Sequence, residues 1–360
     1  MKKSLRNGSI FFLISGLSLF FSGCKAPNAA GQTFPDGSKP AAAVSDAFCL
    51  DTYISVTVYT EDTDPAEAKE AADAAVDLCE ALERRCFSKT IESSDIGRIN
   101  QSGGLATEVE PETVELLNDA AYYYELSGGA VDPSIGSVTA LWDFHETPAA
   151  TAENGSRIPS AANISEALKH TGFDRVLLSA DSVTLSDPLM RLDPGFIAKG
   201  YIAGRMRDAL CSRLAVPAAI INLGGNVVLI GQKPGTEDGL YTVGIEKPFG
   251  DGEAICTIRV TDCAVVTSGI YERCFTENGI LYHHILSASD GMPVNNGLTS
   301  VTIVSGDPTM ADALSTTCFV LGKEKGLDLI ESIDGAEALL IDDQMQLTVS
   351  SGFPEYTLCE

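Results

Sequence analysis

The chain has 360 residues, 50 of them acidic and 24 basic, which gives a formal net charge of -26 at pH 7. This charge argues against nucleic-acid binding and against peripheral attachment to anionic lipid. A polyanionic ligand would have to be held by a metal ion, by backbone donors or by a well-placed lysine.

The N-terminal residues have the features of a secretory signal. Basic residues precede an apolar run at 10–21, which is shorter than the ~20 residues that a membrane-spanning helix needs. The Ser-Gly-Cys sequence that ends at Cys24 resembles the bacterial lipobox, in which the cysteine is lipidated. We therefore predict a lipoprotein signal peptide over residues 1–23 and a lipid anchor at Cys24, on the extracytoplasmic face of the cell membrane. An ordinary signal peptide with an incidental cysteine is the alternative.

The segment 24–45 is rich in Ala, Pro, Gly and Ser and shows no periodicity, so it predicts a flexible linker. Residues 46–360 are enough for one large domain or two intimately joined halves.

Strands and helices are predicted in an irregular order along this domain. The strongest helix signals are Asp64-Pro65, an N-cap followed by a first-turn proline, and Gly128-Gly129, a helix stop. Without strict alternation of strand and helix, the fold class is α+β. The predicted strands are 49–60, 175–178, 183–185, 218–223, 226–230, 241–246, several within 254–266, and 298–304, with a closing hairpin of 338–341 and 347–350; the predicted helices are 65–86, 111–127, 197–214, 310–322 and one ending near 333.

The ten cysteines do not form a recognisable site. Cys24 belongs to the lipobox, and the other nine are scattered with no CxxC pair. Neither a zinc site nor a dense disulfide framework is predicted. Cys79, Cys211 and Cys318 are interpreted as small hydrophobic residues of the core.

The helix at 310–322, MADALSTTCFVLG, is apolar apart from Asp312 and a few hydroxyls. A buried carboxylate needs a cation, a hydrogen-bond donor or a raised pKa. Thr316 lies one helical turn after Asp312, so the two side chains share a face and offer hard oxygen ligands of the kind that Mg²⁺ prefers. A hydrogen bond at the start of the helix is the alternative.

Two glycine-containing segments could meet a ligand. In LDPGFIAKGY, Leu192 to Tyr201, Asp193 and Lys199 flank a glycine turn that opens a helix, so backbone N–H groups and an ammonium can face one anion. In INLGGN, paired glycines between two strands permit either a close ligand approach or a simple bulge.

Two further segments carry polar groups in turns. SGGAVDPSIG contains an acid in a glycine–proline turn, shortly before the only tryptophan, Trp142. YHHILSASDGMPV contains His283 and His284, two of only four histidines. A lone histidine is usually only hydrogen-bonded in place, so this stretch by itself assigns no catalyst.

Seven motifs, five of them described above, occur together and in order. They are SSDIGRIN, GGAVDPSIG with LWDF, LDPGFIAKGY, INLGGN, VTSGIYER, YHHIL and MADALSTTCFVLG. From Leu50 to about Gly326 the chain resembles the FAD:protein FMN transferases, the ApbE-like lipoproteins. The resemblance implies mixed helices and mostly antiparallel sheets in a T-fold-like architecture of two intimately joined halves, with 46–360 as the FAD-binding catalytic domain.

The resemblance also implies a reaction. In this family Mg²⁺ bridges the protein and the FAD pyrophosphate, and FMN is moved onto a Thr or Ser hydroxyl of a partner protein, often a membrane redox subunit, with release of AMP. Matched positions are Asp312, Thr316 and the Phe196 backbone carbonyl for the metal, and Leu50, Thr90, Ala130, Val131, Asp132, Asp193, Lys199 and Ile285 for the flavin nucleotide. Lys199 would also neutralise phosphate charge, and His284 is the candidate general base.

The chain departs from the family pattern at three places. The Asp-Pro-x-Thr-Gly that follows the histidine is replaced by residues 287–291, Ser-Ala-Ser-Asp-Gly, so the acid near His284 is absent or displaced to Asp290. Leu50 replaces Met, and Thr90 replaces a frequent Tyr. Two other functions therefore stay open: a Mg²⁺-dependent FAD pyrophosphatase, and a non-catalytic surface lipoprotein that binds FAD.

Overall fold

The structure is a computed structural model that describes residues 41–144, 156–215 and 217–359. The predicted signal peptide, Cys24 and most of the predicted linker lie outside these ranges. Within the ranges described, no helix is both long and apolar enough to cross a membrane.

The domain begins with a β-hairpin rather than with the single strand predicted at 49–60. Strands β1 (Ala42–Cys49) and β2 (Thr52–Tyr59) pair antiparallel along their whole length. Leu50 and Asp51 form the turn, and both have φ near the left-handed region, 57° and 56°. The linker prediction was too long at its C-terminal end, because small residues in β1 hide the strand alternation that pairing with β2 imposes.

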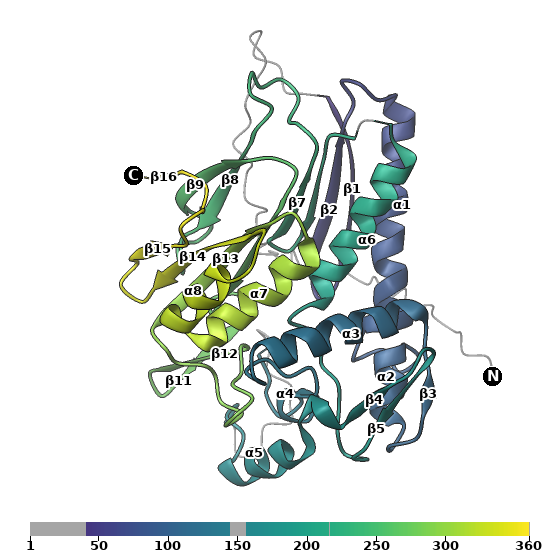
Figure 1. Cartoon of the computed structure of the whole chain (residues 1–360), viewed down its shortest axis with the longest axis vertical. Coiled ribbons are helices and arrows are strands. Elements are labelled where there is room, and N and C mark those ends of the chain that lie inside the picture. The colour runs from purple at the N-terminus through teal and green to yellow at the C-terminus, as the bar shows by residue number, and fades with distance from the viewer. Residues whose placement is uncertain (1–40, 145–155, 216, 360) are drawn as a thin grey trace, which may run out of the picture.

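One eight-stranded antiparallel sheet forms the centre of the fold (Figure 1). The two predicted halves are joined within it, because β2 from the first part of the chain pairs with β6 from the second. The α+β class with mostly antiparallel sheets is confirmed. The order is β1-β2-β6-β7-β10-β13-β14-β15, with β6 Ala219–Leu223, β7 Asn226–Ile230, β10 Ala264–Gly269, β13 Leu298–Ser305, β14 Ala336–Asp342 and β15 Leu347–Val349.

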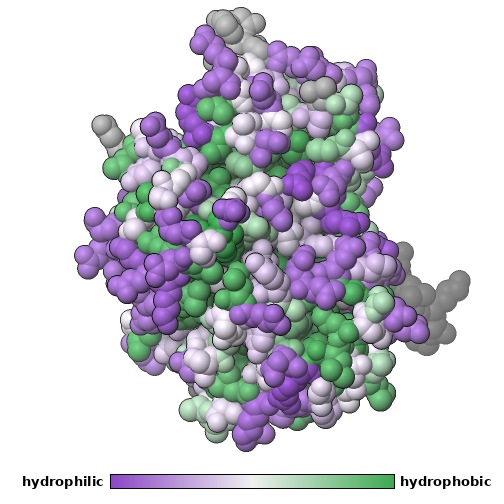
Figure 2. All heavy atoms as spheres, in the orientation of Figure 1, coloured by the Kyte–Doolittle hydropathy of each residue, from purple (hydrophilic) through white to green (hydrophobic). Residues whose placement is uncertain are grey.

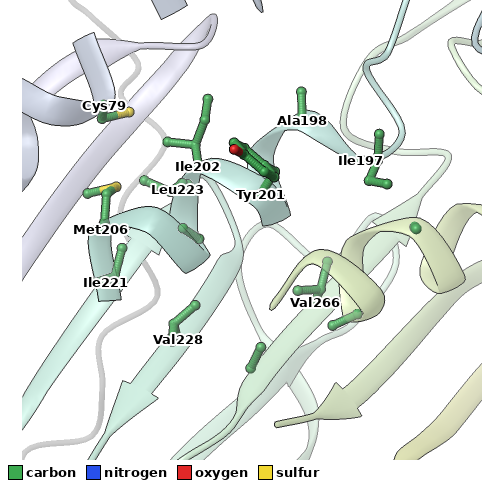
Figure 3. Close-up of a cluster of buried hydrophobic side chains, with 14 of the residues drawn as sticks. Cys79, Ile197, Ala198, Tyr201, Ile202, Met206, Ile221, Leu223, Val228 and Val266 are labelled. Atoms are coloured by element: carbon green, nitrogen blue, oxygen red, sulfur yellow. The ribbon is translucent and has the colours of Figure 1, made fainter. Parts of the chain in front are cut away.

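Four helices cover one face of this sheet: α1 (Pro65–Leu82), α6 (Ala198–Arg213), α7 (Pro308–Leu321) and α8 (Lys323–Glu331). As predicted, Asp64 caps α1, accepting hydrogen bonds from the N–H groups of the first turn, and Pro65 follows at its first position. Figure 3 shows the core between α6 and the strands, with Ile202 and Met206 near Ile221 and Val228. On the surface, hydrophilic residues are spread over the whole visible face (Figure 2).

The opposite face packs against a second sheet made of β8 (Tyr241–Glu246), β9 (Ala254–Val260) and β16 (Tyr356–Leu358). Tyr241 and Ile258 meet Val265 and Leu339 of the large sheet in a separate core. The region predicted as strands within 254–266 is thus divided between two sheets, with β9 in one and β10 in the other.

Two smaller units complete the fold, and most of their elements are too short to show a periodic sequence signal. The first packs α3 (Pro111–Leu126), which begins at Pro111 as predicted, on a three-stranded sheet. The second surrounds Trp142. The remaining elements are the π-helix η1 (Glu83–Phe87), α2 (Asp95–Gln101), β3 (Thr107–Glu108), α4 (Gly136–Thr139), α5 (Ala161–Ala167), η3 (Leu168–His170), η4 (Phe173–Arg175), β4 (Val176–Leu178), β5 (Ser182–Leu185), β11 (Cys274–Glu277) and β12 (Ile280–His283).

Gly200 sets the close approach of α6 to α7. A Cβ at this position would lie 2.3 Å from the Pro308 carbonyl oxygen and 2.5 Å from Asp312 Cβ. Gly200→Ala should therefore lower the free energy of unfolding by about 1–3 kcal/mol, the usual cost of overpacking, because backbone atoms cannot yield. Gly204→Ala in the same helix is the matched control, since its nearest neighbour is Thr309 Oγ1 at 3.8 Å. Urea unfolding measures both, and equal stability of the two variants would contradict the packing described.

Candidate active site at one end of the large sheet

Two turns and two helix segments meet at one end of the large sheet. Ile54 pairs with Leu223, which brings the β1–β2 turn beside the Gly224-Gly225 turn between β6 and β7. Gly224 has φ 62°, and a Cβ there would lie 2.1 Å from Thr52 Oγ1. The paired glycines thus permit a close approach of two backbone turns. Asp312 of α7 joins these turns to the start of α6, because it is hydrogen-bonded both to Asn226 at the start of β7 and to Gly200 in α6.

Asp312 is the buried acid at the centre of this region. Its side chain accepts a 2.7 Å hydrogen bond from Gly200 N at Oδ2 and a 2.8 Å bond from Asn226 Nδ2 at Oδ1. The carboxylate on α7 therefore caps the N-terminus of α6, where the helix dipole favours negative charge. Burial raises the pKa of Asp312 despite the opposing effects of Lys199, Gly200 and Asn226. These partners offset the desolvation only in part, so a further cation would stabilise the ionised form.

The other two predicted metal ligands lie on the same elements. Thr316 follows Asp312 by one turn of α7, and its hydroxyl is 3.0 Å from Ser268 Oγ of β10. Phe196 lies two residues before Ala198, the first residue of α6. Gly200 N, which would bond the Phe196 carbonyl in a regular helix, donates to Asp312 instead.

These groups fit a hard divalent ion. A carboxylate, a hydroxyl and a backbone carbonyl are the oxygen ligands that Mg²⁺ takes, together with water and phosphate oxygens. Among the described residues no group of three or more His, Cys, Asp or Glu could hold a metal. An ion here would therefore depend on one carboxylate, on neutral oxygens and on the substrate itself.

Asp193 forms an ion pair with Lys89. Lys89 Nζ lies 2.5 Å from Asp193 Oδ2, and Thr139 Oγ1 donates to the same oxygen at 2.7 Å. Burial alone would raise the pKa of Asp193, but Lys89 and Thr139 outweigh it and lower that pKa. Thr90, the residue after Lys89, is exposed beside this pair. The family resemblance identified Thr90 as a flavin-nucleotide position but did not identify Lys89.

Val131 and Asp132, which lie in the predicted flavin-contact turn, are both buried. Asp132 Oδ1 accepts hydrogen bonds from Ser134 N and Ser134 Oγ at 2.8 and 2.6 Å, and Oδ2 accepts one from Gly172 N at 3.0 Å. Val131 is buried in the core. The Asp132 carboxylate thus accepts three hydrogen bonds that hold the loop, and the flavin contact expected of this turn stays a prediction.

The two adjacent histidines have different environments. His283 is buried, with Nε2 2.9 Å from the Val294 carbonyl and Nδ1 accepting from Ile285 N at 3.3 Å, so its ring is internal. His284 places Nδ1 3.3 Å from the Arg273 carbonyl. A carbonyl only accepts, so this contact assigns the proton to Nδ1 and leaves Nε2 as a lone-pair acceptor. Burial, with the charges of Arg273 and Lys199 nearby, lowers the pKa of His284 to about 3.

The predicted displacement of an acid to Asp290 is not what the structure shows near His284. Asp290 Oδ1 accepts from Met292 N at 3.1 Å and lies in an exposed turn beside an apolar pocket along α5. The Arg273 carbonyl occupies the orienting role instead. A backbone oxygen leaves no mark in the sequence, so it could not be foreseen.

Leu50 and Ile285, both predicted to contact the flavin nucleotide, have side chains that pack on the main core. Leu50 N donates to Glu83 Oε1 at 3.1 Å, and its side chain packs on the main core. Ile285 is buried in the same core. Sequence reasoning missed Asn226, Lys89 and Ser268 as neighbours of the site. Asn226 and Ser268 do lie in quoted motifs, next to glycines, which is the one signal that pointed to them.

Comparison with known proteins places this geometry in a family. The family model described as the ApbE family matches residues 50–340. A Treponema pallidum protein named FAD:protein FMN transferase is 33% identical over 318 residues, covering 84% of this chain and 85% of its own length. A Klebsiella pneumoniae protein of the same name is 34% identical over 288 residues, covering 76% and 85%. The crystal structure of an ApbE protein from Thermotoga maritima superposes with a TM-score of 0.77 at 33% identity, covering 86% of this chain and 97% of that one. The chain belongs to the ApbE family.

Proposed function

We propose that the protein transfers FMN from FAD to a Ser or Thr hydroxyl of another protein and releases AMP. The observation that carries this proposal is the meeting of three groups at one end of the large sheet. They are the incompletely compensated carboxylate of Asp312, the ammonium of Lys199 in the first turn of α6, and the neutral imidazole of His284. The names of the Treponema and Klebsiella relatives support the same reaction.

Phosphoryl transfer needs charge neutralisation and positioning more than covalent chemistry from the protein. Mg²⁺ would be held by Asp312, Thr316 and the Phe196 carbonyl, and when bound it would neutralise diphosphate charge. Lys199 adds a fixed positive charge beside the same position. The acceptor oxygen attacks the phosphorus of the FMN half while the bond to the AMP oxygen breaks, and His284 Nε2 takes the hydroxyl proton.

The setting of the reaction is also part of the proposal. Lipidation of Cys24 would tether the domain to the extracytoplasmic face of the cell membrane through the segment that precedes β1. Membrane redox subunits with an exposed Ser or Thr segment are then the acceptors within reach. The strongly negative charge of the chain supports neither a nucleic-acid partner nor attachment by charge alone.

The test is to incubate the protein with FAD and Mg²⁺, with and without a redox-domain acceptor. We expect flavin fluorescence that stays with the acceptor after denaturation, and an equal amount of AMP. The matched control is the same acceptor with its Ser or Thr replaced by Ala. Free FMN and AMP in equal amounts under all conditions would identify a pyrophosphatase. Unchanged FAD would identify a binding protein. Either result would overturn the transferase proposal.

A further inference from the structure

Three hydroxyl groups form a continuous chain beside Asp312. Ser268 Oγ of β10 lies 2.7 Å from Ser315 Oγ and 3.0 Å from Thr316 Oγ1, both on α7. Ser315 Oγ also donates to the Asp312 carbonyl at 2.8 Å. Ser315 is fully buried, so water does not compete for its hydroxyl.

The carbonyl at the end of this chain fixes the direction of every hydrogen bond in it. A carbonyl can only accept, so the single proton of Ser315 is used there. Between Ser268 and Ser315, the donor must therefore be Ser268. Its single proton is then also used, and the donor between Ser268 and Thr316 must be Thr316.

Thr316 is thereby left with its proton turned toward Ser268 and both lone pairs turned away from it. This orientation is unusual for a helical threonine, which normally bonds a carbonyl in the preceding turn. The next residue, Thr317, does so, donating to the Ala313 carbonyl at 2.7 Å. A hydroxyl whose lone pairs are free and whose direction is fixed is the form in which threonine ligates a hard cation.

We propose that Ser268 and Ser315 are positioning residues that hold the Thr316 hydroxyl as a preoriented oxygen ligand for Mg²⁺. The inference rests on the proposed function and deepens it, because it says why this hydroxyl can serve the metal. Loss of Ser268 leaves Thr316 free to turn its proton elsewhere. Loss of Ser315 lets Ser268 donate to Thr316 and occupy a lone pair that the metal needs.

The experiment is a Mn²⁺ titration of the full chain with FAD present and no acceptor, followed by the electron paramagnetic resonance signal of free Mn²⁺. Ser268→Ala should weaken Mn²⁺ binding about tenfold, the lower range for residues that orient metal ligands. Ser315→Ala should also weaken it. Ser268→Thr, which keeps the hydroxyl, should restore the affinity. Thr317→Val is the matched control and should leave it unchanged, and thermal melts confirm that each variant is folded.

Two site variants separate failure of this inference from failure of the metal site. If Asp312→Asn and Thr316→Val weaken Mn²⁺ binding while Ser268→Ala does not, the hydroxyl chain has no positioning role and the metal site stands. If Asp312→Asn and Thr316→Val leave Mn²⁺ binding unchanged, and Ser268→Ala and Ser315→Ala do so too, both the metal site and the inference are wrong.

Discussion

Asp312→Asn should reduce FMN transfer about a thousandfold or more at saturating FAD and acceptor. The substitution removes the only carboxylate among the proposed metal ligands, and the charge stabilisation that a divalent ion gives a phosphoryl transition state is several kcal/mol. Covalent flavin on the acceptor, measured by fluorescence after denaturation, gives the rate. Transfer at a wild-type rate would show that the assignment of the metal to α7 is wrong.

Because Asp312 also caps α6, loss of activity could come from a disturbed fold, and a charge swap separates the two roles. In Asp312→Asn alone, the new amide N–H group faces a second donor, either Gly200 N or Asn226 Nδ2, so one hydrogen bond is lost. This loss should lower the free energy of unfolding by about 1–3 kcal/mol. Adding Asn226→Asp restores a donor–acceptor pair between the two side chains. We expect the double variant to regain most of the stability but not the activity. Recovery of both would mean that Asp312 acts only as a cap.

His284→Ala should lower kcat for transfer by about 10²–10⁴-fold, the usual contribution of a general base, with little change in FAD affinity. The lowered pKa, about 3, keeps the imidazole neutral from about pH 4 upward. In wild type, kcat/KM should therefore show no loss from protonation of this group between about pH 8 and pH 5. Stopped-time assays of FMN transfer across this pH range measure the kcat of the variant and the kcat/KM of the wild type.

The adjacent histidine is the matched control. His283→Ala removes contacts with the Val294 carbonyl, Ile285 N and the Phe319 ring, so it should lower stability. The kcat of the protein that remains folded should stay close to wild type. A full wild-type kcat in His284→Ala, or an equal loss in both variants, would remove His284 from the role of base.

The sequence predicts the long and strongly marked elements well. Asp64-Pro65 and Pro111 mark two helix starts that the structure has, and the apolar runs on either side of Gly224-Gly225 are the two strands expected there. Local signals suffice in these cases, because caps, prolines and apolar periodicity act within a few residues.

Elements that depend on distant partners were missed or misjudged. β1 shows little alternation of its own and becomes a strand because it pairs with β2. Short helices such as α2 and α5 are a turn or two long and offer too few residues for a periodic pattern.

The candidate site shows the same division. The family motifs selected Asp312, Lys199 and His284, and the structure brings the elements that carry them to one end of the sheet. What they could not show is the set of contacts across large sequence distances, such as Lys89 with Asp193 or Asn226 with Asp312. All three acids, Asp132, Asp193 and Asp312, are hydrogen-bonded within the protein. Lys89 and Thr139, however, lower the pKa of Asp193, whereas the partners of Asp312 leave its pKa raised.

Asp312 also has a second role that the sequence suggested only in general terms. A buried acid in an apolar helix needed a cation, a hydrogen-bond donor or a raised pKa, and the structure shows that Gly200 and Asn226 are the donors, so that Asp312 ties α6 to α7 and to the β6–β7 turn. The raised pKa reconciles the two roles, because the protein donors offset its burial only in part.

A crystal structure of the protein with FAD and Mg²⁺ tests the central claim most directly. We predict an ion bound by Asp312, the Thr316 hydroxyl and the Phe196 carbonyl, with diphosphate oxygens completing its coordination. A diphosphate bound elsewhere, or bound here with no ion beside α7, would contradict the account and leave Asp312 as a helix cap alone.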